Sequence, residues 1–440
     1  MGVGEEVKVV ESCMVTPSEE MPRKRLWLSP LDLTLVNRGH TPTVYLYRSE
    51  SGAVDDFFDV ARLKLAMAKA LVAFYPLAGR LSVDADGRHE IDCAGQGALF
   101  VVAHSDLTVD DFSNLQPSPE LKRLFVPRVE DSPSLMCGIQ VNFLKCGGVA
   151  LGTALHHVVI DAISAFHFFQ TWSAFCRDGD GGGTTVAALE LPCHDRTLLR
   201  ARSPPVVHPD ALSVFCPSAQ DVTEPASGAV VNEIFVISRD QVADLKRACG
   251  GRDGWRVSTF CAVSAHVWRC ICAARQLPPD AMTRLVFPAN VRRSLRPPLP
   301  DSYFGNGIIM LGAVGKVRDI IASEDDQPMA SVAGRIRDTI RRWDDELVRS
   351  VIDYLEIEGS QTASPAGSMP ETDLRVVSWL GMPVYNADYG WGKPLVMHRA
   401  VQQRAGFVYL MDGLDGSVRI LVSTEPSILK DFQRLLYANL

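Results

Sequence analysis

Residues 135–161 read LMCGIQVNFLKCGGVALGTALHHVVID, and this stretch decides the fold. Apolar side chains occupy every second position over 135–143, which is the pattern of a strand with one covered face. Gly147 and Gly148 then supply a turn. The alternation resumes over 149–155, so the stretch predicts a β-hairpin in the protein interior.

Two adjacent histidines end this hairpin. Because strand side chains alternate, His156 and His157 should lie on opposite faces, and only one of them can face a given cleft. A helix is predicted directly after them, since apolar residues recur at spacings of three and four over 162–176. The same spacing over 59–74, with an aspartate at its start, predicts a second buried helix.

The composition is that of a large globular protein. The chain has 440 residues, of which 47% are hydrophobic and 22% charged, so it can bury a sizeable core. Its formal net charge of -8 has the wrong sign for binding to a phosphate backbone. The 11 cysteines form no paired CxxC framework, and we expect reduced core thiols. An acidic N-terminus and the lack of a long apolar run favour the cytoplasm.

Strands and helices intermingle in both halves of the chain, which predicts the α/β or the α+β class with two similar lobes. A region rich in proline and glycine follows residue 178 and favours a long crossover connection. We therefore expect an N-terminal lobe over 1–178, a linker over 179–228 and a C-terminal lobe over 229–440. Within the last of these, the patterns predict helices over 257–275 and 329–343 and a terminal helix from 426.

The candidate catalytic residues stand at the end of the hairpin. The chain contains no HExxH, GxSxG or GxxxxGK[ST] signature, which leaves His157 and Asp161, four residues apart. A histidine near its ordinary pKa is largely unprotonated at pH 7 and can accept a proton from a hydroxyl or an amine. From these residues alone, an interior histidine with satisfied hydrogen bonds is the commoner interpretation, and a metal site lacks a third ligand.

Five segments, in order along nearly the whole chain, resemble the plant BAHD acyltransferase family. The resemblance is specific because each segment matches a family motif at its expected place. The segments are YPLAGR at 75–80, HVVID at 157–161, DRTLLRAR at 195–202, YFGN at 303–306 and DYGWG at 388–392. Within the family the chain most resembles the hydroxycinnamoyltransferases, through HTPTVY at 40–45 and the pair Ser378-Trp379.

This resemblance implies an α/β protein with two lobes of chloramphenicol-acetyltransferase-like fold, each a mixed sheet with flanking helices. Acyl-CoA and the acceptor would meet in a tunnel between the lobes. Acyl-CoA is a co-substrate in such enzymes, and no metal or other cofactor is needed. His157 would deprotonate the acceptor as it attacks the thioester carbonyl directly, without an acyl-enzyme. Trp391 could offer its indole N–H to the resulting oxyanion.

The resemblance also implies structural residues around the site. Asp161 would turn away from the substrate and pair with Arg292, and Asp388 would organise its own loop. One departure from the family pattern is Ala162, which stands where a glycine usually follows the HxxxD aspartate. If that position has a positive φ, the alanine should cost about 1 kcal/mol.

A second departure indicates the acceptor. Family members that acylate shikimate carry an arginine in a Ser-Trp-x-Arg-x-Pro segment, and this arginine holds the acceptor carboxylate. Residues 378–383 read SWLGMP, so Gly381 replaces the arginine. An acidic acceptor would lose a contact worth about 1.5–3 kcal/mol. We therefore expect an aliphatic amine such as putrescine or agmatine as acceptor and a coumaroyl, caffeoyl or feruloyl group as the acyl group.

Other residues are weaker candidates for binding. The candidates to line the acyl or acceptor pocket share one predicted strand, which an ordinary strand would explain nearly as well; they are His40, Thr41, Thr43 and Tyr45. Ser258 and Thr259 at a helix start are candidates for CoA contacts, although helix capping alone explains them. A carboxylate for a distal ammonium could come from Glu356, Glu358, Glu371 or Asp373.

Two other functions stay open at this point. The first is O-transfer to shikimate, quinate or another alcohol on the same fold. The second is a non-catalytic ligand-binding protein that keeps the lobes without turnover. In each case we expect a monomer that binds small molecules and has neither nucleic-acid nor membrane partners.

Overall fold

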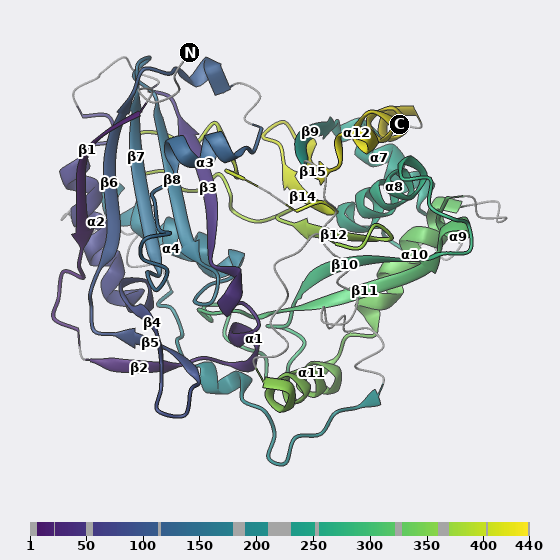
Figure 1. The fold of residues 1–440 in the computed structure, drawn as a ribbon, viewed down its shortest axis with the longest axis horizontal. Coiled ribbons are helices and arrows are strands. Elements are labelled where there is room, and N and C mark those ends of the chain that lie inside the picture. Colours follow the sequence, from purple (N-terminus) through teal and green to yellow (C-terminus); the bar gives the residue numbers. More distant parts are fainter. Residues whose placement is uncertain are drawn as a thin grey trace. The chain divides into compact units, whose positions relative to one another are not determined.

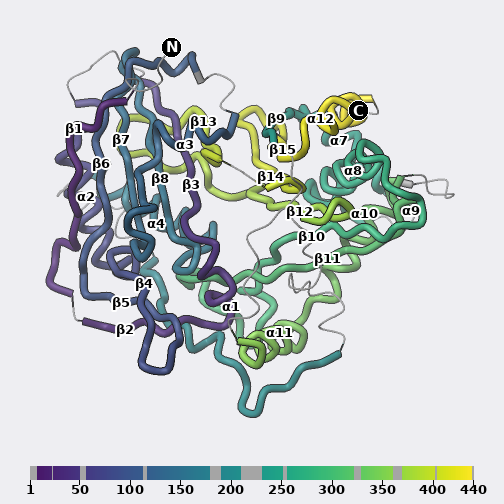
Figure 2. The backbone as a smooth tube through the Cα atoms, viewed as in Figure 1, coloured from purple at the N-terminus to yellow at the C-terminus, as the bar shows by residue number. Residues whose placement is uncertain are grey.

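The computed structural model describes the chain except for residues 1–6, 22, 50–55, 113–115, 179–189, 210–229, 251–254, 322–327, 360–368, 402–403 and 439–440. The chain divides into two units, whose paths can be followed in Figures 1 and 2. Unit 1 comprises Met1–Arg200, Leu299–Gly307 and Met382–Val401. Unit 2 comprises Ala201–Pro298, Ile308–Gly381 and Gln402–Leu440.

This division differs from the lobe boundaries drawn from the sequence. The first unit continues to Arg200 instead of ending at 178, and it takes two segments from the C-terminal half. One of them contains β13 (Val396–Arg399), which pairs with β3 (His40–Tyr47). Long-range pairing of this kind leaves no mark in the local composition. Most of the predicted linker, including the glycine run at 179–183, lies outside the described residues.

Unit 1 is built on a six-stranded mixed sheet with the order β1-β6-β7-β8-β3-β13. All neighbouring strands are antiparallel except β6 and β7. A small antiparallel sheet has the order β2-β5-β4. The bounds are β1 Val7–Val15, β2 Lys24–Trp27, α1 Pro30–Leu33, α2 Val60–Ala73, β4 Arg80–Val83, β5 His89–Cys93, β6 Ala98–Ser105, α3 Pro119–Phe125, β7 Cys137–Leu144, β8 Val149–His156 and α4 Ala162–Asp178.

The predicted hairpin and the two predicted helices of this unit are confirmed as β7–β8, α2 and α4. The expectation of one covered face is wrong, because both strands are buried almost throughout. On one face Tyr45 packs against Phe169 of α4, with ring centroids 5.7 Å apart. On the other, α3 lies across the strands (Figure 1), and a Cβ on Gly152 would meet the carbonyl oxygen of Phe125 at 1.7 Å. Glycine at 152 therefore permits this close approach.

Unit 2 contains a second six-stranded mixed sheet, with the order β11-β10-β12-β14-β15-β9. Its central helix α8 packs against α7, α9, α10 and α12. The helices predicted in this half are confirmed as α8, α10 and α12. The bounds are β9 Val231–Ile237, α7 Arg239–Ala248, α8 Thr259–Ala274, β10 Met282–Asn290, β11 Ile308–Lys316, α9 Val317–Ile321, α10 Pro328–Arg341, α11 Asp345–Glu358, β12 Asp373–Ser378, β14 Phe407–Asp412, β15 Val418–Thr424 and α12 Pro426–Ala438.

Two further observations concern the sequence expectations. The ten cysteines that the structure describes are free thiols, and seven of them are buried. Within the described ranges, no helix has both the length and the apolar character needed to cross a membrane.

Candidate active site

The HxxxD segment forms a short loop between β8 and α4. Its aspartate is buried and binds backbone amides with both carboxylate oxygens. Oδ1 of Asp161 accepts a hydrogen bond from the N–H of Ser164 at 3.0 Å, which caps α4, and Oδ2 accepts one from Gly307 at 3.0 Å. Asp161 therefore fixes the start of the helix and ties the loop to the 303–307 segment.

Ala162, which departs from the family pattern, carries no strain. It is the first residue of α4 and is not among the residues with positive φ. The cost expected for a non-glycine residue at this position is therefore absent.

The ring of His157 is held in its neutral form. Burial lowers its pKa to about 4, the positive charges of Arg38 and Arg399 add to this effect, and the nearby Asp161 opposes it only in part. Its Nδ1 is buried and has no hydrogen-bond partner in the described part of the chain. Because the ring takes up a proton only near pH 4, His157 is an unprotonated base throughout the neutral range.

A fully buried ion pair lies behind the HxxxD loop. The carboxylate of Asp32 is 2.7 Å from the guanidinium of Arg196, and neither side chain reaches solvent. Burial by itself lowers the pKa of Arg196, but the charge of Asp32 outweighs it and raises the pKa above its usual range. The N–H and hydroxyl of Ser29 also donate to Asp32, at 2.9 and 2.6 Å. Hydrogen bonds to the remaining polar atoms stabilise such a pair inside a protein, although Nε of Arg196 is buried without a hydrogen-bond partner in the described part of the chain.

The ion pair is connected to the HxxxD loop by the side chain of Asn306 and by Arg196 itself. The two N–H groups on Nδ2 of Asn306 are shared among three acceptors: the Asp32 carboxylate at 2.9 Å and the carbonyl oxygens of His157 and Val158 at 2.9 and 3.2 Å. Arg196 donates to the carbonyl oxygen of the next residue, Val159, at 2.8 Å. The carbonyl groups of three consecutive loop residues are thus fixed from one buried centre.

Sequence reasoning missed this centre. Arg196 and Asn306 stood inside recognised segments without an assigned role, whereas Asp32 had no signal at all. It lies in the short helix α1, where the capping contact with Ser29 explains it locally. Only the long-range pairing shows that it supports His157.

The strand residues expected to line a pocket separate into two groups. Thr41, Thr43 and Tyr45 alternate with His40 along β3, so they face α4 while His40 faces the other side of the sheet. The hydroxyl of Thr43 shares a hydrogen bond of 2.6 Å with that of Thr153. Burial raises the pKa of Tyr45 well above its usual range, so its phenol stays neutral.

Trp391 does not lie beside His157. Its ring stacks on Phe58, with centroids 5.3 Å apart, and the guanidinium of Arg62 lies 4.9 Å above it. Phe58 in turn packs against Tyr47, at the end of β3 opposite to the one that His157 contacts.

The lengths of β3 and α4 show how far Trp391 lies from His157. The eight residues of β3 extend over about 23 Å. The 17 residues of α4 extend over about 25 Å, and Arg62 binds carbonyl groups at the far end of that helix. The expectation that Trp391 donates to an oxyanion at His157 is therefore wrong. Its neighbour Asp388 accepts from the amides of Gly390 and Gly392 at 2.9 and 3.1 Å, so it organises this remote loop.

The remaining candidates lie in unit 2. Ser258 accepts from the amide of Cys261 at 3.1 Å and caps α8, so capping explains both Ser258 and Thr259. Arg292 is buried just after β10, and its pairing with Asp161 stays a prediction. Gly381 has φ +72° and donates to Asp412 at 2.6 Å.

One of the carboxylates considered for a distal ammonium is already neutralised. Asp373 is buried at the start of β12 and lies 2.7 Å from the guanidinium of Arg284. Glu358, at the end of α11, is exposed.

Comparisons with known proteins agree with this architecture. A sequence model of the Transferase family matches residues 5–438. The chain is 44% identical over 450 residues to putrescine hydroxycinnamoyltransferase 1 of Oryza sativa subsp. japonica, with 99% of each chain covered. It is 39% identical over 447 residues to shikimate O-hydroxycinnamoyltransferase of Nicotiana tabacum, with 98% of this chain and 99% of the relative covered.

Among solved structures, that of vinorine synthase matches with a TM-score of 0.76 and 24% identity, covering 99% of this chain and 98% of the other. At this identity the likeness concerns the fold, and it confirms the expected α/β architecture.

The buried ion pair can be tested by substitution. Arg196→Met removes the charge and keeps a long side chain, and we expect the free energy of unfolding to fall by about 3–5 kcal/mol because the charge of Asp32 remains buried without compensation. The double variant Asp32→Asn/Arg196→Met should recover part of this loss. Urea unfolding followed by circular dichroism measures each variant. If the loss of unfolding free energy in the double variant equals the sum of the losses in Asp32→Asn and Arg196→Met, the two charges do not compensate each other.

Proposed function

The chain belongs to the Transferase family of BAHD acyltransferases, and from this premise we propose that it moves a hydroxycinnamoyl group from CoA to the amino group of an aliphatic amine such as putrescine or agmatine. Membership of the family makes it an acyl-CoA-dependent acyltransferase. The relative from Oryza sativa, whose name states putrescine as its acceptor, supports the proposed amine.

One observation of the structure carries the proposal: His157 offers an imidazole that stays unprotonated at neutral pH. In the proposed reaction a neutral amine attacks the thioester carbonyl, and a tetrahedral oxyanion forms. His157 takes a proton from the attacking nitrogen, the C–S bond then breaks, and CoA leaves as the thiol with the transferred proton. The carbon–nitrogen bond of the amide replaces the thioester bond, and no acyl group is placed on the protein.

The protonation of the acceptor sets the order of events. An aliphatic amine has a pKa of about 10.4, so only about one molecule in 2,500 is neutral at pH 7. A base with a pKa near 4 is too weak to remove a proton from the free ammonium ion. The acceptor therefore binds, or reacts, as the neutral amine. The proton becomes acidic enough for His157 only when the nitrogen has begun to bond to carbon.

O-transfer is the second candidate function. The relative from Nicotiana tabacum is named for shikimate, and an alcohol could also use a neutral His157 as its base. Gly381 favours the amine, because this position holds no side chain that could bind a carboxylate. We also propose a cytoplasmic monomer with reduced cysteines, which the free, mostly buried thiols support.

The pH dependence of the rate distinguishes the two acceptors. With putrescine, kcat/KM should rise about tenfold per pH unit between pH 7 and 9, since the neutral amine becomes more abundant while His157 stays unprotonated. With shikimate the profile should be flat over the same range. Initial rates of CoA release at fixed p-coumaroyl-CoA measure both profiles, and a flat profile with putrescine would contradict the proposed order of events.

The roles of His157 and Trp391 separate in a pair of variants. His157→Ala should lower kcat by about two to four orders of magnitude, because the base is lost. Trp391→Phe keeps the stacking on Phe58 and should leave kcat close to that of the parent. Steady-state kinetics measures kcat of both variants, and thermal unfolding checks that each is folded. Absence of acyl transfer in the parent protein as well would favour the non-catalytic binder.

Gly381 can be tested with a matched pair of variants. A Cβ at this position meets no atom within 4 Å, but its positive φ costs any other residue about 1 kcal/mol, so Gly381→Arg and Gly381→Ala share the same strain. Only the arginine adds a guanidinium. With p-coumaroyl-CoA and equimolar putrescine and shikimate, the parent and Gly381→Ala should form the amide.

In the same competition Gly381→Arg should shift kcat/KM toward shikimate by about tenfold. Mass spectrometry of the products measures the ratio of amide to ester. If the parent protein forms only the shikimate ester, the amine is the wrong acceptor.

A further inference from the structure

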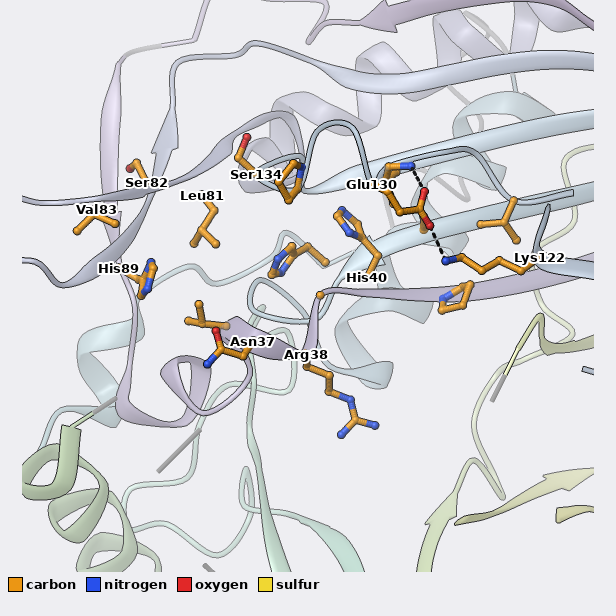
Figure 3. Close-up of a pocket in the computed structure, with 18 residues that line it drawn as sticks. Asn37, Arg38, His40, Leu81, Ser82, Val83, His89, Lys122, Glu130 and Ser134 are labelled. Atoms are coloured by element: carbon orange, nitrogen blue, oxygen red, sulfur yellow. Dashed lines mark hydrogen bonds and ion pairs between the residues drawn. The ribbon is translucent and has the colours of Figure 1, made fainter. Parts of the chain in front are cut away.

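Unit 1 contains a cavity of about 680 Å³ on the face of the sheet opposite to the one that carries Thr41 and Thr43 (Figure 3). Its floor is made by His40 and Pro42 of β3 and by Ala154 and His156 of β8, which pair directly with each other. Residues of β4, β5 and α3 enclose the sides. His157 does not line it, as the alternation of side chains at the end of β8 requires.

Two histidines give the cavity a defined donor and a defined acceptor. The Nε2 atom of His40 contacts the carbonyl oxygen of Leu135 at 2.6 Å, and because a carbonyl only accepts, this nitrogen carries the proton. Nδ1 of His156 accepts from the amide of Val158 at 3.2 Å, so the proton of its neutral ring is on Nε2. The rings meet edge to face, with centroids 4.9 Å apart.

The remaining nitrogens of both rings make no hydrogen bond to any described residue. Burial lowers the pKa of His40, and it lowers that of His156 to about 3, so both rings are neutral at pH 7. Nδ1 of His40 is then an unused acceptor, and Nε2 of His156 is an unused donor. His156 has an exposure of 3%, and its ring lines the open cavity, so a water molecule or a ligand that enters the cavity can satisfy this donor.

Three residues with charged side chains line the cavity, namely Arg38, Lys122 and Glu130. Lys122 and Glu130 neutralise each other at 2.5 Å, and the Glu130 carboxylate also accepts from the amide of Val129 at 3.1 Å (Figure 3). The guanidinium of Arg38 points away from His40 (Figure 3), and its charge instead lowers the pKa of His157. Beside His40, where Lys122 and Glu130 are the charges that act on the ring, an ionised ligand would thus find no uncompensated counter-charge.

The other walls are mainly apolar. They include Leu81, Val83, Val126, Val129 and Pro133, and the volume lies within the range of small-molecule sites. A phenol suits this arrangement because its hydroxyl stays protonated at pH 7 and can donate to one nitrogen while accepting from the other. Its ring matches the apolar walls.

We propose that this cavity is a second small-molecule site, for an uncharged phenol whose hydroxyl is held between His40 and His156. The site is separate from the one at which acyl transfer occurs. The cavity nevertheless borders the backbone of His157. Gly39 lines the cavity, and its carbonyl oxygen accepts a hydrogen bond from the amide of His157 at 2.9 Å. An occupant would contact the immediate neighbours of the proposed base.

Isothermal titration of the full chain with two matched probes tests the site. Methyl p-coumarate carries the phenol and no charge, and methyl cinnamate lacks only the hydroxyl. Titrations are made in the presence of a saturating, non-reactive thioether analogue of p-coumaroyl-CoA, and again with His157→Ala. Under both conditions methyl p-coumarate should bind about tenfold more tightly than methyl cinnamate, because its hydroxyl gains hydrogen bonds to His40 and His156.

Variants locate the binding and keep the result independent of acyl transfer. His40→Phe and His156→Phe preserve ring size and should remove the difference between the probes. Ser134→Trp, at the wall of the cavity, should weaken both probes equally, with thermal unfolding confirming that each variant is folded. Absence of binding, equal affinity for the two probes, or a difference that persists in both histidine variants would overturn the proposal. The readout is binding, so it is independent of acyl transfer. A protein that forms no hydroxycinnamoyl amide but still distinguishes the probes would support this site and contradict the proposed function.

Discussion

The buried ion pair between Asp32 and Arg196 is the constraint on which the geometry around His157 depends. The loop from 157 to 161 has no regular secondary structure, so its carbonyl groups need partners from elsewhere. Those partners are Asn306 and Arg196, both fixed by the same carboxylate. The cost of burying two charges is offset only while all these contacts are present. The position of the base is therefore set by residues that are remote from it in sequence and never touch a substrate.

Local periodicity was sufficient to predict the elements that deliver this loop. The hairpin β7–β8 and the helix α4 follow from alternation and from spacings of three and four, because each element buries a face of its own. Periodicity could not show that both faces of the hairpin are covered, since α3 contributes its contacts from outside the pattern. Periodicity placed His157 at the end of the hairpin, and the resemblance to the BAHD family made it the candidate base. The support of this base was not predicted, because Asp32 and Asn306 meet only in the folded chain.

Trp391 shows the limit of a recognised motif. The DYGWG segment was recognised as a family motif, and its tryptophan was given a catalytic role. That role requires Trp391 to lie close to His157, which the sequence cannot show. The stack with Phe58 and the cation of Arg62 place it where β3 and α4 have each run their full length away from His157. The same rule of alternation that separated His156 from His157 also separates His40 from Thr41, and it could have been applied to the pocket candidates from the sequence alone.

The composition of unit 1 from three separated segments has a consequence for biosynthesis. Strand β13 closes one edge of its main sheet, yet it is translated after two of the three segments of unit 2. Until residue 399 has left the ribosome, the backbone groups along that side of β3 lack their native partner. At about 5–20 residues per second, this interval lasts on the order of 20–70 s after β3 is synthesised. During that time a nascent chain presents an open strand edge to other chains, so the last stage of folding is also the stage most exposed to misassembly.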